Sequence, residues 1–450
     1  MRAALINPFG VELFHPGNLL NEICPDYRSL VEFSGDELEC MPSLGLLLMA
    51  AYFPPEFELR YIQDHFYYDF KNPDSPVYFN EDFDLVVLSG FTMQAPRAYR
   101  IADHFRAKGA AVFIGGQHAS ALPQEAKLHA DTVLAGEGED IFPQALADWQ
   151  KGTLKPFYYS QKNLPGELIP SPRFDLLTHL ERYNKVPIQA TRGCPYSCEF
   201  CSIKAVYGNR YRKRPVEKVI ADLKAAKAIF PRPHIAFTDE NMLVDARYAK
   251  ELVKAMIPLK LSWEAYADIK VAEDEELLDL LRESGCLELE IGLETVNPES
   301  LNAVSPFKAR LLEKYPAMIK TIQDHGVGVM GLFVLGFDQD GPDIFPRLWD
   351  FIEKNRIFES DLAVLNPLPG SPLYRRLKAE GRILSEDWSR YTWNQINFEP
   401  KSMSQEELKK GMLWLFKQAH SPKWQQLQNS PLNPRCGREN PTSPKAGGPG

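Results

Sequence analysis

The chain lacks the features that mark membrane, secreted and nucleic-acid-binding proteins. Its most apolar stretch, LGLLLMAAYF at residues 44–53, has about ten residues, which is too short to cross a bilayer. The first residues, MRAALINPFG, lack the apolar core and cleavage site of a signal peptide. A formal charge of −9 argues against a nucleic-acid partner, because phosphate binding favours a basic surface. We therefore expect a cytoplasmic protein that has no transmembrane segment and does not bind nucleic acid.

Cysteine is scarce as well, with seven in 450 residues. Four of them stand singly, at Cys24, Cys40, Cys286 and Cys436, so the sequence shows no disulfide framework. The other three fall close together in the stretch TRGCPYSCEFCSI (residues 191–203). In a reducing compartment, such a group indicates metal or redox chemistry.

Residues 1–150 alternate between apolar runs and amphipathic segments. The runs RAALINPF, FDLVVLSGF, AAVFIGG and DTVLAGEG are continuous, as in strands that are buried on both faces. Segments between them, such as APRAYRIADHFRAKG, have the period of a helix. This alternation predicts an α/β fold with a doubly wound parallel sheet. Residues 151–185 contain several prolines and no sustained period, and we expect them to form a linker.

Six strand–helix units follow between residues 186 and 400. The predicted strands are VPIQAT, HIAFTD, LSWEAYA, LELEIGLE, VGVMGLFVLG and DLAVLN. Such a series predicts a partial (βα)6 barrel, in which the chemistry lies at the carboxyl ends of the strands. Residues 401–420 predict a C-terminal helix, and the polar, Pro- and Gly-rich residues 421–450 predict a disordered tail.

The three clustered cysteines come directly after the first strand of the predicted barrel. A structural zinc site requires four ligands, usually on two paired arms, and no second arm follows in the sequence. An electron-transfer iron–sulfur cluster usually has four cysteine ligands, so three thiolates leave one iron free to bind something else. We therefore favour an iron–sulfur cluster with an open position over a zinc site.

The spacing C-x3-C-x2-C, with an aromatic residue just before the third cysteine, resembles the radical S-adenosylmethionine (SAM) superfamily. The resemblance implies a 4Fe-4S cluster held by Cys194, Cys198 and Cys201, whose free iron chelates the amino and carboxylate groups of SAM. An electron then cleaves the sulfonium to a 5′-deoxyadenosyl radical, which takes hydrogen from an unactivated C–H bond. The electron would come from an external reductant such as flavodoxin or ferredoxin.

The same resemblance implies roles for residues at later strand ends. Asp239 and Glu240, in FTDEN, would hold the amino group of SAM, and Glu294, in IGLETVN, would contact its ribose or carboxylate region. Gly331 would let the adenine approach the fifth strand, and Phe200 would lie beside the cofactor. Each of these residues has an ordinary alternative role, such as a helix cap or a solvated strand end.

The stretch NPLPGSPLY (residues 366–374) resembles one branch of this superfamily, many of whose members carry an N-terminal cobalamin-binding domain. Residues 1–150 are similar to such a domain, which implies cobalamin as a further cofactor. The candidate cobalamin-binding residues lie at three strand ends, in SGFTMQ, GGQHA and GEGE: Ser89, Thr92, Gln94, Gly115, Gly116, Gln117, His118, Gly136 and Glu137.

The sequence departs from methionine-synthase-type domains, because no Asp-x-His-x-x-Gly loop with its cobalt-ligating histidine follows the first strand. Two alternatives therefore stay open for the first part of the chain. It binds cobalamin without that loop, or it is a scaffold domain that only packs against the barrel. His118 is then either a ligand or a hydrogen-bonded loop residue.

The resemblance implies an enzyme that functionalises a C–H bond of a largely apolar small molecule, such as a tetrapyrrole or a hopanoid or isoprenoid lipid. Cobalamin-assisted methyl transfer is the preferred reaction, and hydroxylation or ring closure without methyl transfer is the alternative. A non-catalytic iron–sulfur redox protein is a more remote alternative. Several aromatic residues near the motif, including Trp263 and Tyr266, either line the substrate site or belong to the barrel core. The basic run RYRKR (residues 210–214) either meets substrate carboxylates or forms a solvated face.

Overall fold

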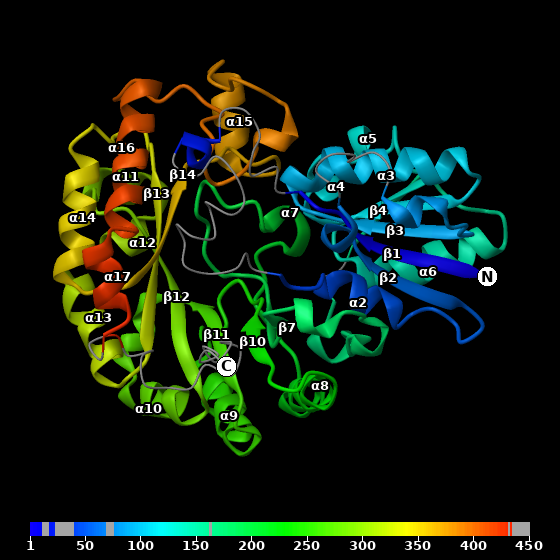
Figure 1. Cartoon of the computed structure of the whole chain (residues 1–450), viewed down its shortest axis with the longest axis horizontal. Helices are drawn as coiled ribbons and strands as arrows, with labels where there is room; N and C mark the ends of the chain where they lie inside the picture. Colours follow the sequence, from blue (N-terminus) through cyan, green and yellow to red (C-terminus); the bar gives the residue numbers. More distant parts are fainter. Residues whose placement is uncertain (11–17, 23–39, 69–75, 162–163, 431–432, 434–450) are drawn as a thin grey trace, which may run out of the picture.

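The computed structural model describes residues 1–10, 18–22, 40–68, 76–161, 164–430 and 433. Two six-stranded parallel sheets lie side by side, one built from each half of the chain (Figure 1). A short antiparallel pair, β8 (Thr191–Arg192) and β9 (Arg212–Lys213), is separate from both sheets. The predicted fold class, a doubly wound sheet followed by a partial barrel, is confirmed.

The first sheet has the strand order β2-β1-β3-β4-β5-β6. Its strands are β1 (Arg2–Asn7), β2 (Glu58–Gln63), β3 (Leu85–Ser89), β4 (Ala111–Gly115), β5 (Thr132–Ala135) and β6 (Phe157–Tyr159). The order reverses between β1 and β3, and in doubly wound sheets ligands bind at the carboxyl ends of the strands near such a reversal.

Helices cover both faces of the first sheet because both faces are apolar. Ala3 and Leu5 of β1 share a core with α2 (Leu44–Ala50) and α6 (Gly138–Gln150). Ala4 and Ile6 share a second core with α3 (Ala95–Ala107), on the opposite face. Successive residues of a strand point to opposite faces, so the continuous apolar run in RAALIN follows from this double coverage.

The second sheet has the order β14-β13-β12-β11-β10-β7, in which each strand lies beside the one before it in the chain. Its strands are β7 (Val186–Ile188), β10 (His234–Phe237), β11 (Ser262–Ala267), β12 (Cys286–Glu294), β13 (Gly328–Leu335) and β14 (Glu359–Val364). Because β7 and β14 are opposite edges and do not pair, the barrel is open.

The main helices of the barrel lie on the outside of its sheet (Figure 1). They are α8 (Val216–Ile229), α9 (Ala246–Met256), α10 (Glu275–Glu283), α11 (Pro298–Val304), α13 (Tyr315–Asp324), α14 (Ile344–Lys354) and α16 (Gln405–Ala419). Phe333 and Leu335 of β13 are buried among these helices, whereas Leu332 and Val334 are only half-buried and face the open interior. The inward face of β13 is therefore apolar.

Two predicted boundaries need correction. Residues 151–185 are not only a linker, because β6 pairs with β5 at the edge of the first sheet. At three residues, this strand is too short to show an alternating pattern in the sequence. The predicted disordered tail begins with a helix, α17 (Pro422–Gln428), whose Trp424 is buried against Trp349 and Phe358. Composition alone hid this helix, although Ser421 followed by a proline is a helix-start signal. Residues 431–432 and 434–450 of the predicted tail lie outside the described residues.

Four short helices also need mention because they lie near the strand ends. They are α4 (Gly116–Ala121), α5 (Pro123–Ala126), α7 (Lys204–Tyr207) and α15 (Pro372–Ala379), and α12 (Pro306–Ala309) follows α11. The sequence indicated α5 but not α4, since Gly116 and His118 read as loop residues. None of the helices that the structure describes is long and apolar enough to cross a membrane.

Candidate functional site

The cysteine loop (residues 193–203) leaves the carboxyl end of β7 through the short strand β8. Gly193 has a φ of 82°, and a Cβ atom there would clash with the carbonyl oxygen of Arg210, so the loop begins where only glycine fits. The amide of Cys201 donates to the carbonyl oxygen of Cys198 at 3.2 Å, which closes the turn between the last two cysteines. A local backbone hydrogen bond therefore shapes the turn that carries Cys198 and Cys201.

The thiols of Cys194, Cys198 and Cys201 are free and half-buried. Burial and the charges of the other two thiols raise the pKa of Cys201 to about 11. A thiol of this kind ionises only when a cation offsets the charge of its neighbours. Within the described residues, no three His, Cys, Asp or Glu side chains converge on a point that could hold one metal ion. Three cysteines in one loop, with no fourth cysteine beside them in the sequence, match the open-position cluster that the motif predicts better than a four-ligand zinc site.

Asp239 and Glu240, at the end of β10, both contact the chain just before the first cysteine. The carboxylate of Asp239 is fully buried and accepts hydrogen bonds from the Thr191 hydroxyl at 2.6 Å and the Ala190 amide at 3.1 Å. Glu240 accepts a hydrogen bond from the Gly193 amide at 2.7 Å. Asp239 thus fixes the strand end, and Glu240 lies closer to the cysteines.

Burial raises the pKa of both carboxyl groups, of Asp239 to about 6 and of Glu240 to about 7. The negative charge of Asp239 adds to the shift at Glu240. When it is ionised, such a buried carboxylate offers both oxygens as hydrogen-bond acceptors. Glu240 therefore fits the role of acceptor for the N–H groups of the SAM amino nitrogen.

Glu294 is paired with a residue that the sequence did not single out. It has a φ of 65°, and its carboxylate accepts a hydrogen bond from the Lys308 ammonium at 2.5 Å. Lys308 also donates to the Gly292 carbonyl oxygen at 2.7 Å and lies near the Cys198 thiol, whose charge helps to raise the pKa of the ammonium. Lys308 lies on α12, and the sequence around it matches no recognisable motif. The contact of Glu294 with SAM stays a prediction.

Phe200 lies within the cysteine loop, and Gly331 lies on β13. The ring of Phe200 is partly buried and lies 6.1 Å from the ring of Phe337, centroid to centroid. A Cβ atom at Gly331 would come within 2.6 Å of the Phe333 ring and 3.0 Å of Ile357. Close packing among the outer side chains is therefore a sufficient reason for this glycine, and its contact with adenine stays a prediction.

The candidate cobalamin-binding histidine is fully engaged. His118 is 3% exposed; its Nδ1 is 3.3 Å from the Thr92 hydroxyl and its Nε2 is 3.1 Å from the Glu125 carboxylate. The Trp388 indole also donates to Glu125, at 2.9 Å. With both ring nitrogens occupied, the arrangement favours the hydrogen-bonded loop histidine over a metal ligand.

The candidate glycines pack the strand ends of the first sheet tightly. Gly116 has a φ of 91°, and a Cβ atom there would lie 2.7 Å from both the Ser89 hydroxyl and the Gly90 nitrogen. Gly136 has a φ of 99°, and its amide donates to the Ser120 hydroxyl at 2.9 Å. Gly115 has an ordinary extended backbone. These glycines bring the loops after β3, β4 and β5 together at one edge of the sheet.

Gln94, Gln117 and Glu137 have different roles. The amide of Gln94 donates to the Pro8 carbonyl oxygen at 2.6 Å, so this side chain holds the loop after β1. Gln117 reaches the second half of the chain, where its amide donates to the hydroxyl of Ser202 in the cysteine loop. Glu137 also faces the second half, because its carboxylate accepts hydrogen bonds from Arg192 at 3.1 Å and Arg212 at 2.8 Å.

Arg192, just before the cysteine loop, is a site residue that sequence reasoning missed. Its side chain is 2% exposed and bridges Glu137 and Glu139, the latter at 2.7 Å. Burial would raise the pKa of Glu139, but Arg192 holds it below its usual range. Two arginines of the basic run have similar internal partners. Arg212 donates to Glu137 at 2.8 Å, and the buried Arg214 pairs with Asp222 at 2.7 Å. At these two positions, the run is therefore neither a solvated face nor a substrate contact. The spacing of the run gave no sign of this internal role.

Family models match three parts of the chain. The Radical SAM superfamily model matches residues 188–348, the B12 binding domain model residues 38–146, and a Domain of unknown function (DUF4070) residues 371–425. The bacteriochlorophyllide d C-12(1)-methyltransferase of Chlorobaculum tepidum is 31% identical over 359 residues, which are 78% of this chain and 78% of that protein. The chain belongs to the radical SAM superfamily. It is an enzyme of the branch with a B12-binding domain, and its cofactors are a 4Fe-4S cluster, SAM and cobalamin.

Other relatives and solved structures agree with this assignment. The hopanoid C-2 methylase of Rhodopseudomonas palustris is 28% identical over 360 residues, which cover 77% of this chain and 66% of that protein. The radical SAM methyltransferase TsrM of Kitasatospora setae, solved with cobalamin and a 4Fe-4S cluster, has a TM-score of 0.66 at 16% identity, over 92% of this chain and 90% of that chain. The cobalamin-dependent radical SAM enzyme OxsB also has a TM-score of 0.66, at 15% identity, over 90% of this chain and 65% of that chain. At these identities, the two structures support the fold alone.

Proposed function

We propose that this enzyme transfers a methyl group to a carbon of a largely apolar substrate. The observation that carries the proposal is a contact between the two candidate cofactor loops. Gln117, just after β4 of the first sheet, donates a hydrogen bond to Ser202, the residue after the third cysteine. A methyl group carried at one loop can reach a carbon activated at the other only if the two loops border one space. This contact supports such a shared space.

The residues of both loops fit the cofactors. Cys194, Cys198 and Cys201 would hold the cluster, and Glu240 would accept hydrogen bonds from the amino group of SAM beside it. When bound, the cluster and SAM supply hydrogen abstraction from an unactivated C–H bond, and cobalamin supplies the methyl group. Cobalamin would lie over the close-packed strand ends at Ser89 and Gly116, where the loops after β3 and β4 meet.

The interior of the barrel supports an apolar substrate. Tyr266 of β11 is 41% exposed, and Leu332 and Val334 of β13 are half-buried on the inward face. Trp263, in contrast, is fully buried and belongs to the core. The relatives named above are a bacteriochlorophyllide methyltransferase and a hopanoid methylase, so tetrapyrroles and polycyclic lipids are the substrate classes to test first. A cytoplasmic location and a reductant such as flavodoxin or ferredoxin complete the proposal.

The test uses protein purified anaerobically from cobalamin-supplied cells and reconstituted with iron and sulfide. It is incubated with reductant, SAM carrying a deuterated methyl group, and extracts that contain tetrapyrroles or hopanoids. The expected result is a product that carries the deuterated methyl group, and Cys201→Ala serves as the control that gives none. A product that is oxidised or cyclised without the label would overturn methyl transfer and support the alternative reaction.

A further inference from the structure

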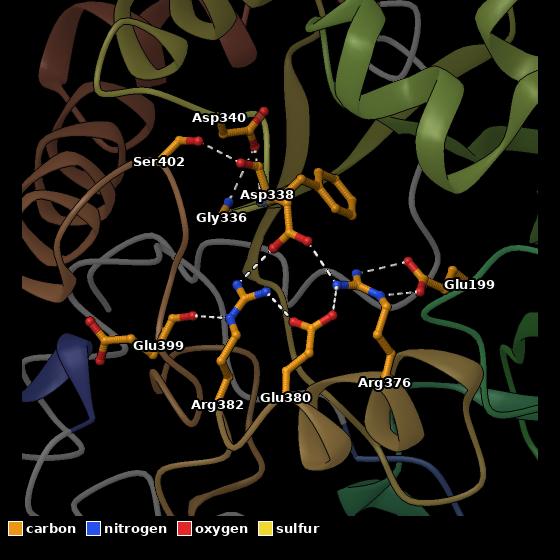
Figure 2. A network of polar contacts seen from close by, with 10 residues as sticks. Glu199, Gly336, Asp338, Asp340, Arg376, Glu380, Arg382, Glu399 and Ser402 are labelled. Atoms are coloured by element: carbon orange, nitrogen blue, oxygen red, sulfur yellow. Dashed lines mark hydrogen bonds and ion pairs between the residues drawn. The ribbon is translucent and has the colours of Figure 1, made fainter.

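Charged side chains from the end of the barrel form a network that reaches into the cysteine loop (Figure 2). Glu199 lies between the second and third cysteines, in C-E-F-C. Its carboxylate accepts two hydrogen bonds from the guanidinium of Arg376 on α15, at 2.6 and 3.1 Å. Two parallel bonds of this kind fix the orientation of both groups as well as their distance.

The guanidinium of Arg376 is itself held from its other side. It donates to Asp338, just after β13, at 2.7 Å, and Arg382 donates to the second oxygen of Asp338 at 2.7 Å. Burial would raise the pKa of Asp338, but the two guanidinium groups hold it below its usual range. Arg382 is further tied to the Glu399 carbonyl oxygen at 2.8 Å. Arg376 therefore joins the cysteine loop to the end of a barrel strand.

The backbone of the same segment also contacts the loop. The amide of Leu373 donates to the carbonyl oxygen of Glu199 at 2.9 Å, and Ser371 caps α15 by accepting from the Tyr374 amide at 3.0 Å. Gly370 has a φ of 87°, and a Cβ atom there would lie 2.9 Å from Ala205, just after the loop. The start of the segment therefore packs directly on the cysteine loop.

We propose that the segment 371–402 is a clamp that positions the cysteine loop, and that Arg376 is its positioning residue. The inference rests on the proposed role of the cysteines as cluster ligands. It assigns a role to the start of the region that matches a domain of unknown function (residues 371–425). Arg376 acts through Glu199: it fixes the turn that carries Cys198 and Cys201, and with it the geometry in which their thiolates meet the cluster.

The exposure of the pair separates positioning from stability. The side chains of Arg376 and Glu199 are 34% and 25% exposed. A single ion pair with such access to water contributes about 1 kcal/mol or less to folding, and Glu199→Gln removes only this pair. Arg376→Gln also removes the bonds to Asp338 and Glu380, so it is expected to lower stability more than Glu199→Gln does. An effect on the cluster that both variants share can therefore be separated from an effect on unfolding.

The experiment compares Arg376→Gln, Glu199→Gln and the double variant with wild type. Arg375→Gln is the matched control, because Arg375 is the neighbouring arginine on α15, is exposed, and contacts only the Gly370 carbonyl oxygen among the described residues. Each protein is reconstituted, and iron content, thermal unfolding, the electron paramagnetic resonance (EPR) spectrum of the reduced cluster, and the rate of 5′-deoxyadenosine formation are measured.

The expected result is a changed EPR spectrum and a rate loss on the order of tenfold in Arg376→Gln, since small displacements of reacting groups have effects of this size. Glu199→Gln should show the same changes, and the double variant should be no worse than either single one. Arg375→Gln should match wild type, as should the unfolding of Glu199→Gln. Unchanged spectra and rates in Arg376→Gln would overturn the clamp. If wild type itself holds no cluster, the proposed function fails, which is a distinguishable outcome.

Discussion

The strand ends of the two sheets are similar in position but differ in what their polar residues do. At the barrel, Asp239 and Glu240 turn toward the cysteine loop and hold its entry. At the first sheet, Gln94 and His118 are bonded within their own domain, while Glu137 is bonded across to Arg192. The barrel edge thus presents charged groups around three thiols, whereas the described polar groups at the edge of the first sheet are mostly bonded to other protein groups. We infer that the first half supports a cofactor by shape and the second half by ligation.

The largest effect is expected where ligation is removed. Cys198→Ala should abolish both the cluster and the cleavage of SAM, because two thiolates cannot replace the three-ligand set. Iron and sulfide analysis and 5′-deoxyadenosine assays measure the two effects. Cys40→Ala, a buried cysteine of the first half, is the control and should keep both. Retained activity in Cys198→Ala would show that Cys198 is not a ligand of the cluster.

A second large effect is expected at the buried pair beside the cysteines. Lys308→Met leaves the Glu294 carboxylate buried without its partner, and we expect a loss of about 3–5 kcal/mol in the free energy of unfolding. The double variant Glu294→Gln with Lys308→Met should recover most of that loss, since it removes both charges. Denaturant titration measures both. A single variant as stable as wild type would show that the pair is not needed to hold the edge of the barrel.

An intermediate effect is expected from pH at Glu240. Its pKa of about 7 lies above the usual range, so the folded protein binds a proton there that the unfolded chain releases near pH 4.5. Stability from this group is therefore fully present below pH 4.5 and declines as the pH rises toward 7. SAM binding has the opposite trend, because the N–H groups of its amino nitrogen donate to the ionised carboxylate. We expect the affinity for SAM to fall about tenfold from pH 8 to pH 6.

Calorimetric titration of the reconstituted protein with SAM at several pH values measures this trend. The matched control is Glu240→Gln, in which affinity should be lower and should fall less steeply as the pH decreases over the same range. If the variant keeps the slope of wild type, Glu240 is not the group that accepts the amino group of SAM.

The smallest effect is expected at the first sheet. His118→Gln should leave the visible spectrum of bound cobalamin unchanged, because both nitrogens of His118 already face Thr92 and Glu125. The control is the wild-type protein with bound cobalamin to which free imidazole is added, because imidazole that binds the cobalt gives the spectrum of a nitrogen-ligated cobalamin. A spectral change in the variant would make the first sheet a ligating site and remove the contrast between the two halves.

Much of the fold could be predicted from the sequence, because each buried strand is a continuous apolar run. All six barrel strands lie where these runs end in polar motifs, for instance β10 before Asp239 and β12 before Thr295. The short strand β6 and the helix α17 could not be found in this way. Three residues show no period, and a buried tryptophan in a polar segment is visible only once its partners are known.

The residues of the candidate site also fall into two groups, those that a local motif predicts and those that only the fold brings together. The cysteine motif is local in sequence, so its spacing alone pointed to the loop. Arg192 and Arg376 were missed because each meets its partner far along the chain; Arg376, for example, lies 177 residues from Glu199. Lys308 lies only 14 residues from Glu294, but it belongs to no recognisable motif. Long-range ion pairs leave no periodicity or spacing in a single sequence, and only the fold brings their charges together.

The central claim is that three cysteines hold a cluster whose open position takes SAM. The most direct measurement is the EPR spectrum of the reduced, reconstituted wild-type protein before and after SAM is added. We expect about four irons per chain and a clear change of the spectrum when SAM is added, because SAM binds directly to one iron. A cluster whose spectrum is the same with and without SAM would contradict the account and point to four protein ligands.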